Sequence, residues 1–347
     1  MNARYYTLRQ ADLPALFDRA RGDYDVIAKR RDANGNLCYG PATSFADVDF
    51  TAEQPRLSAK ACAFPQIEEL TRYRREGRTF TDATPAAPAR PALLFGVNMC
   101  DAAAFEILDK VFSWDYKDDP YLERRARTTL FALACDALQI DCFCDRLDFP
   151  TAAVDLIAYR RGDDYLVEVR TEKGAALAEK YAACFGPAPA AEATGPGATS
   201  PPAAKKPPLL EEARPQLSRS FDHEDWALLA GTCVGCGTCT YLCPTCHCFD
   251  IQDEGGPAEG RRLRVWDHCT GRTFTQMPAH QPRDRQFQRY RQRLLHKFWY
   301  YPERFGPILC TGCGRCITFC PVKINIRELV EYFGGLKATP PGGARRK

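Results

Sequence analysis

The apolar residues near the N-terminus have first a helical and then a strand period. Leu13, Leu16 and Phe17 fall on one face of a helix, and residues 23–31 alternate between polar and apolar side chains. The alternation ends at Asn34-Gly35, a pair typical of tight hairpin turns. This part of the sequence predicts a helix followed by a β-hairpin.

Two short, almost wholly apolar runs come next, at residues 92–97 (ALLFGV) and 129–135 (TLFALAC). Such runs are typical of strands that are buried on both faces of a sheet. Residues 102–112, between them, have a helical period, and residues 154–174 predict two strands around a turn at Gly162-Asp163-Asp164. We therefore expect a mixed α/β domain over residues 1–185, with a strand order that the pattern does not define.

The remaining sequence divides into a linker and a second domain. Residues 186–216 begin with a run of Pro, Ala and Gly that offers almost no side chain for a core, which predicts an extended linker. Residues 217–347 are rich in cysteine and predict mainly helical turns and loops. The expected fold class is α+β: a mixed α/β N-terminal domain and a mainly helical, ferredoxin-like C-terminal domain.

One long helix is predicted within the C-terminal domain, at residues 283–301. Its cations suggest two alternatives, a solvated basic face or positive charges that face a negatively charged group or partner surface. The sequence leaves both open. The apolar face holds Phe287, Tyr290, Leu294 and Phe298, and the other faces hold Arg285, Arg289, Arg293 and Lys297.

Composition limits the class of protein. The chain has 347 residues, 18 cysteines and a net charge of +3, which is too small to imply a nucleic-acid partner. The first residues contain charges where an export signal has its apolar region, and we find no apolar run of about 18 residues. These features predict a cytoplasmic protein with no membrane span, in which the cysteines bind metal rather than form disulfides.

The most specific motif is C-x2-C-x2-C-x3-C-P, which occurs twice. In this motif three thiolates hold one 4Fe-4S cluster, and the fourth, before proline, binds the neighbouring cluster. Zinc favours separated C-x2-C pairs and is the less suitable metal. The motif predicts two 4Fe-4S clusters and a protein that carries electrons. The predicted ligands are Cys233, Cys236, Cys239 and Cys320 for one cluster, and Cys310, Cys313, Cys316 and Cys243 for the other.

Four further cysteines lie near the ends of the predicted buried strands. Cys100 and Cys135 each follow such a strand, and Cys142 and Cys144 follow closely. If the two strands are parallel, their carboxyl ends share one edge of the sheet, where ligands usually bind. The alternatives are a third 4Fe-4S cluster held by these four thiolates, or four small buried apolar residues.

Other cysteines and histidines have no assigned ligand role. Cys246, Cys248 and Cys269 are expected to pack around the first cluster, although a labile metal site is the alternative. Three isolated cysteines are expected to be structural, and three histidines are candidates for hydrogen bonds to the clusters. The isolated cysteines are Cys38, Cys62 and Cys184, and the histidines are His247, His268 and His296.

Taken together, these motifs make the chain resemble the iron-sulfur beta subunit of cytoplasmic nickel-iron sulfhydrogenases and the related A subunit of anaerobic sulfite reductases. The resemblance covers both domains apart from the linker. The segments that carry it are GVNMCD (96–101), DDPYLERR (118–125), CFC (142–144), YLVEVRTEKG (165–174), CPTCHCFDI (243–251), VWDHC (265–269), residues 289–301 and the second cysteine run.

The resemblance implies a non-catalytic subunit that carries electrons between a flavin- and NAD(P)-binding subunit and a catalytic metal subunit, of nickel-iron or siroheme type. The sequence has neither GxGxxG nor GxxxxGK[ST], so a nucleotide site in this chain has no support from motifs. Two other classes remain as alternatives: a free-standing reductase acting through its N-terminal domain, and a zinc protein contacting nucleic acid.

Overall fold

The computed structural model describes residues 4–84, 90–188, 209–335 and 337. The chain forms two compact units, each built from several segments. The first unit contains residues 1–63, 90–208 and 310–314, and the second contains residues 64–89, 209–309 and 315–347. Both helices and sheets are present, so the predicted α+β class is confirmed.

The first unit is built on an eight-stranded sheet with the order β10-β1-β9-β8-β7-β6-β2-β3. Its centre, β2-β6-β7-β8, is parallel, and the outer pairs are antiparallel. The strands are β1 (Arg4–Leu8), β2 (Asp25–Arg31), β3 (Leu37–Pro41), β6 (Ala92–Asn98), β7 (Thr128–Leu133), β8 (Leu156–Arg161), β9 (Asp164–Val169) and β10 (Gly186–Pro187).

Helices bury this sheet. Helices α1 (Leu13–Asp23) and α4 (Glu172–Lys180) share one apolar core with alternate residues of the central strands. Helices α2 (Met99–Phe112) and α3 (Asp119–Arg127) connect β6 to β7, and α2 contacts both strands. The continuous apolar runs that predicted β6 and β7 are explained by this burial, because every residue of β7 is buried.

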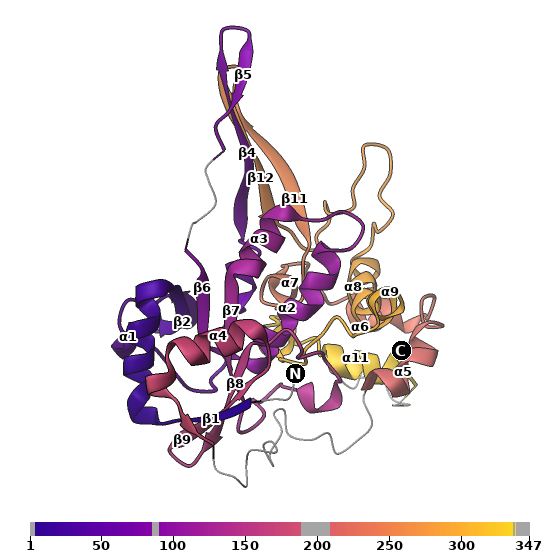
Figure 1. Ribbon diagram of the computed structural model, residues 1–347. Helices are drawn as coiled ribbons and strands as arrows, with labels where there is room; N and C mark the ends of the chain where they lie inside the picture. The colour runs from indigo at the N-terminus through magenta and orange to yellow at the C-terminus, as the bar shows by residue number, and fades with distance from the viewer. Residues whose placement is uncertain (1–3, 85–89, 189–208, 336, 338–347) are drawn as a thin grey trace. The chain divides into compact units, whose positions relative to one another are not determined.

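The second unit combines short helices with a four-stranded antiparallel ribbon (Figure 1). The helices are α5 (Leu209–Leu217), α6 (Asp225–Ala230), α7 (Thr238–Tyr241), α8 (Gln286–Leu295), α9 (Tyr301–Phe305), α10 (Arg315–Thr318) and α11 (Ile326–Phe333). A π-helical turn, η6 (His296–Tyr300), joins α8 to α9, so the predicted long helix contains a π segment. The Trp226 ring of α6 stacks on the Phe333 ring of α11, with centroids 3.7 Å apart.

The ribbon was not expected from the sequence. Strands β11 (Phe249–Gly255) and β12 (Glu259–Trp266) pair with β4 (Ile67–Glu76) and β5 (Thr79–Asp82), in the order β11-β12-β4-β5. Residues 64–89, which we expected in the N-terminal domain, therefore belong to the second unit. The strands give no clear apolar alternation because every residue of β11 and most residues of β4 are exposed, and charged side chains are frequent in both.

The predicted linker differs from the structure at both ends. At its start, Gly186–Pro187 is strand β10, which pairs with β1. At its end, residues 209–217 are helix α5, whose Leu209, Ala213 and Leu217 are buried at a helical spacing. The part of the predicted linker at residues 189–208 lies outside the described residues.

Candidate metal centres

The two cysteine runs have the same backbone conformation. In each run two glycines have φ angles of 66° and 75° (Gly235 and Gly237, Gly312 and Gly314). In each run the N–H of the first glycine donates to the sulfur of the first cysteine, at 3.5 and 3.4 Å. Left-handed φ angles favour glycine, so these residues let the chain turn around its cysteines. The sequence repeat is also a structural repeat.

The first predicted ligand set surrounds one hollow in the second unit. Its walls leave about 350 Å³ that no protein atom fills, part of it open to solvent. Because Cys320 comes from the second run, the structure brings it beside the first run as the crossed arrangement requires. The assignment of ligands stays a prediction. Five cysteines line the hollow: the four predicted ligands of this cluster, Cys233, Cys236, Cys239 and Cys320, and also Cys316, which is predicted for the other cluster.

Hydrogen bonds to these sulfurs come from several elements. Gln286 Nε2, on α8, donates to Cys233 Sγ at 3.2 Å, and the N–H of Ile324 donates to Cys320 Sγ at 3.3 Å. Burial raises the pKa of the Cys233 thiol. Donors of this kind orient the ligands of a cluster and stabilise its sulfur charge. Gln286 was not expected here, because it has no motif of its own.

The helix with the predicted basic faces places two cations against cysteine sulfur. Arg293 Nε donates to Cys239 Sγ at 3.1 Å, and Lys297 Nζ donates to Cys243 Sγ at 3.3 Å. Both cations are almost fully buried. Of the two alternatives for this helix, the solvated face is therefore wrong for Arg293 and Lys297, which face thiols instead.

The surroundings of Cys243 favour its thiolate form. A hydrogen bond from the Cys246 thiol lowers the pKa of Cys243 well below its usual value, with help from the charges of Lys297 and Arg293. The same bond raises the pKa of Cys246. A deprotonated sulfur is the form that binds iron. This arrangement gives Cys246 a supporting role beside a predicted ligand.

The second predicted ligand set is divided between the units. Cys310 and Cys313 belong to the first unit, and Cys316 and Cys243 belong to the second. The joint ligation of one cluster by these four cysteines stays a prediction.

The four N-terminal cysteines lie together in the first unit. Cys100 is in the first turn of α2 after β6, and Cys135 follows β7, so the two strand ends share one edge as expected. With Cys142 and Cys144 they line a hollow that leaves about 410 Å³ free of protein atoms, comparable with the hollow at Cys233. The four cysteines therefore share one hollow, part of which is open to solvent. The third cluster itself stays a prediction.

The segment Cys310–Gly314 completes the walls of this hollow. Cys313 lines it, and the Cys142 sulfur lies 3.5 Å from the Cys313 carbonyl oxygen. The N–H of Phe143 donates to the Gly312 carbonyl at 2.9 Å. A Cβ atom at Gly312 would lie only 2.5 Å from the backbone nitrogen of Cys144, so glycine is required there.

A buried lysine lies behind the same hollow. Lys29, on β2, is 0% exposed, and its Nζ donates to Asn98 Oδ1 at 2.7 Å and to the Thr51 carbonyl. Burial lowers its pKa to about 8, although nearby acids and Cys135 act in the opposite direction. Burial also raises the pKa of Cys144 to about 12. Lys29 was not expected here, because it lies in an ordinary strand pattern.

The remaining cysteines and histidines are placed as follows. Cys248 and Cys269 are hydrogen-bonded to each other, and this bond raises the pKa of Cys269. Burial raises the pKa of Cys62 to about 12, and Cys184 lies in the apolar core of the sheet. His268 lies over Gly237, where a Cβ atom would approach its ring within 2.8 Å. Within the described ranges, no three His, Cys, Asp or Glu side chains are gathered as for a single metal ion.

Comparison with known proteins assigns the family. Residues 232–324 match the family of 4Fe-4S dicluster domains. Over 253 residues the chain is 33% identical to the beta subunit of sulfhydrogenase 2 from Pyrococcus furiosus, an alignment that covers 70% of this chain and 75% of that relative. The chain belongs to the sulfhydrogenase beta-subunit family.

Membership in the sulfhydrogenase beta-subunit family confirms the predicted resemblance. With its 4Fe-4S dicluster domain, the chain is an iron-sulfur electron-transfer subunit of a multi-subunit complex. No solved structure matches the chain. None of the helices that the structure describes is both long and apolar enough to span a bilayer.

Proposed function

We propose that this subunit relays electrons between a flavin- and NAD(P)-binding subunit and a catalytic nickel-iron subunit. One observation carries the proposal beyond a simple dicluster protein: Cys313, a predicted ligand in the dicluster domain, lines the same hollow as the four N-terminal cysteines. Two neighbouring cluster sites would lengthen the electron-transfer path that this chain provides between two partner subunits.

The residues of the third site suit a 4Fe-4S cluster. When bound, such a cluster takes up and releases a single electron. Cys100 and Cys135 extend from adjacent parallel strands, and Cys142 and Cys144 come from the loop that follows. Gln54 Nε2 lies 3.8 Å from Cys100 Sγ and can donate to it. Two of the proposed ligands thus follow directly on strand ends, and two come from the loop.

The assignment of partners follows from the relative and from the motifs. The matched relative is named as a subunit of a sulfhydrogenase, which favours a hydrogenase-type partner over a siroheme protein. The sequence has no glycine-rich phosphate loop. We therefore assign the flavin and the pyridine nucleotide to a separate subunit.

The complex produced from the neighbouring genes provides the test. Hydrogen and NAD(P)H, added separately under anaerobic conditions, should each reduce the clusters of this subunit, as followed by electron paramagnetic resonance (EPR). Cys135→Ser should remove one cluster signal and slow hydrogen-dependent NAD(P)+ reduction, while hydrogen oxidation with an artificial dye continues. Copurification with siroheme and no nickel would contradict the hydrogenase assignment, and unchanged iron content in Cys135→Ser would contradict the third cluster.

A further inference from the structure

Two cations are buried one helical turn apart in the second unit. Arg293 lies in the last turn of α8 and is 1% exposed, and Lys297 lies in the π-helical turn η6 and is 2% exposed. Burying a full charge is costly unless other groups compensate it. The surroundings of these side chains therefore indicate what they stabilise.

The hydrogen bonds of both cations go to cysteine sulfur and to neutral oxygen. Arg293 donates to Cys239 Sγ at 3.1 Å and to the Cys239 carbonyl at 2.7 Å. Lys297 donates to Cys243 Sγ at 3.3 Å, to Thr245 Oγ1 at 3.0 Å and to the Leu309 carbonyl at 2.9 Å. Each cation thus has one cysteine sulfur of its own.

The two sulfurs belong to different predicted clusters. Cys239 lies in α7, and Cys243 follows two residues after the end of that helix, so the two sulfurs are four residues apart. Arg293 and Lys297 have the same spacing, and each of them contacts one of the two cysteines. Cys239 is assigned to the cluster at Cys233, and Cys243 crosses to the cluster of the second run. The helix therefore presents one cation to a ligand of each cluster.

A third observation indicates an absent acceptor beside Arg293. Its Nη1 atom is buried and has no hydrogen-bond partner among the described residues. Arg293 interacts electrostatically with Cys239 and with Cys316, a ligand predicted for the other cluster. A buried N–H group without a partner is unfavourable. An anionic cluster held by these cysteines would supply the acceptor.

We propose that Arg293 and Lys297 are positioning residues that set the reduction potentials of the two 4Fe-4S clusters, one residue for each. The proposal rests on the ligation proposed above. A thiolate-bound cluster becomes more negative when it accepts an electron, and a buried positive charge favours that state. Each cation therefore raises the potential of the cluster whose ligand it contacts.

The test is a redox titration of the full chain after anaerobic reconstitution, followed by EPR. Cys310→Ser and Cys233→Ser first assign the two signals to the two runs. Lys297→Met should then disfavour reduction of the Cys310 cluster about tenfold, a downward shift of about 59 mV for a one-electron couple. Arg293→Met should do the same to the Cys233 cluster. Lys297→Arg and Arg293→Lys, which keep the charge, should remain close to wild type.

Arg291 provides the matched control. It is on the same helix, but its guanidinium donates to the Phe221 carbonyl at 2.7 Å and lies over the Phe221 ring. Arg291→Met should leave both potentials unchanged. An equal shift in Arg291→Met, or unshifted potentials in both Met variants at full iron content, would overturn the proposal.

Measuring the iron content of the variants distinguishes a failure of this proposal from a failure of the ligation on which it rests. If Lys297→Met loses iron, Lys297→Gln keeps donor groups without the charge and should show the same shift. Loss of iron from both, with retention in Lys297→Arg, would assign Lys297 to holding the cluster and would overturn the tuning role. A shift confined to the Cys233 cluster in Lys297→Met would contradict the crossed ligation instead.

Discussion

At the scale of single residues, the predicted ligands depend on neighbours that have no motif. Cys243 receives hydrogen bonds from Cys246 and Lys297, and Lys297 is 54 residues away in the sequence. Two donors to one sulfur stabilise a thiolate, which is the form that binds iron. The spacing of the cysteines in the sequence is enough to predict that Cys243 is a ligand. The supporting contacts depend on where α8 packs.

The crossed ligation can be tested with one substitution. Cys243→Ala removes a ligand that we assign to the cluster of Cys310, Cys313 and Cys316, so iron should fall and the EPR signal of that cluster should be damaged. The signal assigned by Cys233→Ser should persist. Loss of the Cys233 signal instead would contradict the crossed arrangement and indicate that each run binds its own cluster.

Lys29 gives a prediction for pH dependence. Its pKa is lowered to about 8 by burial, whereas the unfolded chain keeps the proton to about pH 10.5. Between these values the unfolded state binds more protons, so the contribution of Lys29 to stability rises with pH. Urea unfolding of the metal-free chain should show this rise, on the order of 3 kcal/mol at most, relative to Lys29→Met. Equal pH slopes in the two proteins would contradict it.

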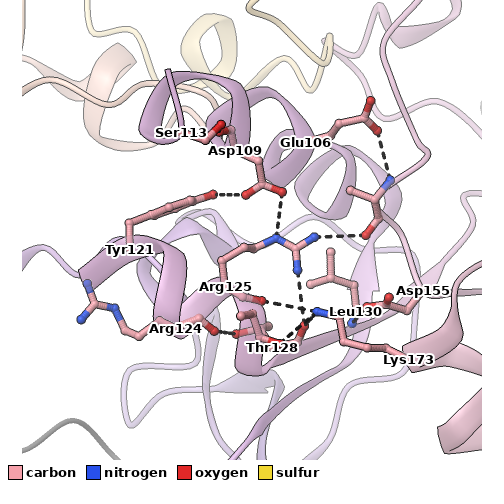
Figure 2. Close-up of polar contacts among 12 residues, drawn as sticks. Glu106, Asp109, Ser113, Tyr121, Arg124, Arg125, Thr128, Leu130, Asp155 and Lys173 are labelled. Atoms are coloured by element: carbon pink, nitrogen blue, oxygen red, sulfur yellow. Dashed lines mark hydrogen bonds and ion pairs between the residues drawn. The ribbon is translucent and has the colours of Figure 1, made fainter. Parts of the chain in front are cut away.

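At the scale of elements, a polar network fixes the helices between β6 and β7 (Figure 2). Arg125 of α3 donates to Asp109 of α2 at 3.1 Å and to the carbonyls of Thr128 and Ala153 at 3.3 and 3.2 Å. The Tyr121 hydroxyl donates to the other Asp109 oxygen at 2.7 Å. These contacts hold α2, which carries Cys100, in place relative to β7, which leads to Cys135.

Breaking that network should affect both stability and the third site. Arg125→Met leaves Asp109 without its cation, and loss of one partner from a buried pair typically costs about 3–5 kcal/mol. Because Asp109 is partly exposed, we expect the lower end of this range, measured by chemical denaturation. Iron at the N-terminal site should fall with it. Glu123→Gln, at an exposed position of the same helix, should change neither quantity.

At the scale of the whole molecule, the two units do not follow the order of the sequence. The second unit takes β4 and β5 from residues 64–89, and its helix α5 begins at Leu209. The first unit takes residues 310–314 from the second cysteine run. A fragment starting near residue 216 would lose a paired hairpin and part of a helix. Cluster content is therefore best measured on the full chain.

Iron analysis of the reconstituted full chain should give twelve iron atoms, four for each of three clusters. Cys100→Ser or Cys135→Ser should lower the content toward eight, because the dicluster domain remains. If the wild-type chain contains eight iron atoms and these substitutions leave that number unchanged, the prediction of a third cluster is wrong. Stoichiometric zinc without iron would contradict all three sites.

The purified subunit alone should contain no flavin and should not oxidise NAD(P)H. The reason is the missing glycine-rich phosphate loop, which dinucleotide sites use to bring backbone N–H groups to the pyrophosphate. Absorbance of the purified protein and NAD(P)H-dependent dye reduction test this expectation. Stoichiometric flavin, or dye reduction by the subunit alone, would place the nucleotide site in this chain.

The sequence by itself determined the features that depend on local chemistry. The spacing of cysteine, glycine and proline predicted a dicluster domain, and apolar runs predicted β6 and β7, because ligation and strand burial each leave a short-range pattern. Tertiary structure decided the rest. The ribbon joins charged strands almost 200 residues apart, and Arg293, Lys297 and Lys29 meet cysteine sites only through packing. Contacts between distant residues that have ordinary local patterns leave no periodicity in the sequence, so only the folded chain defines them.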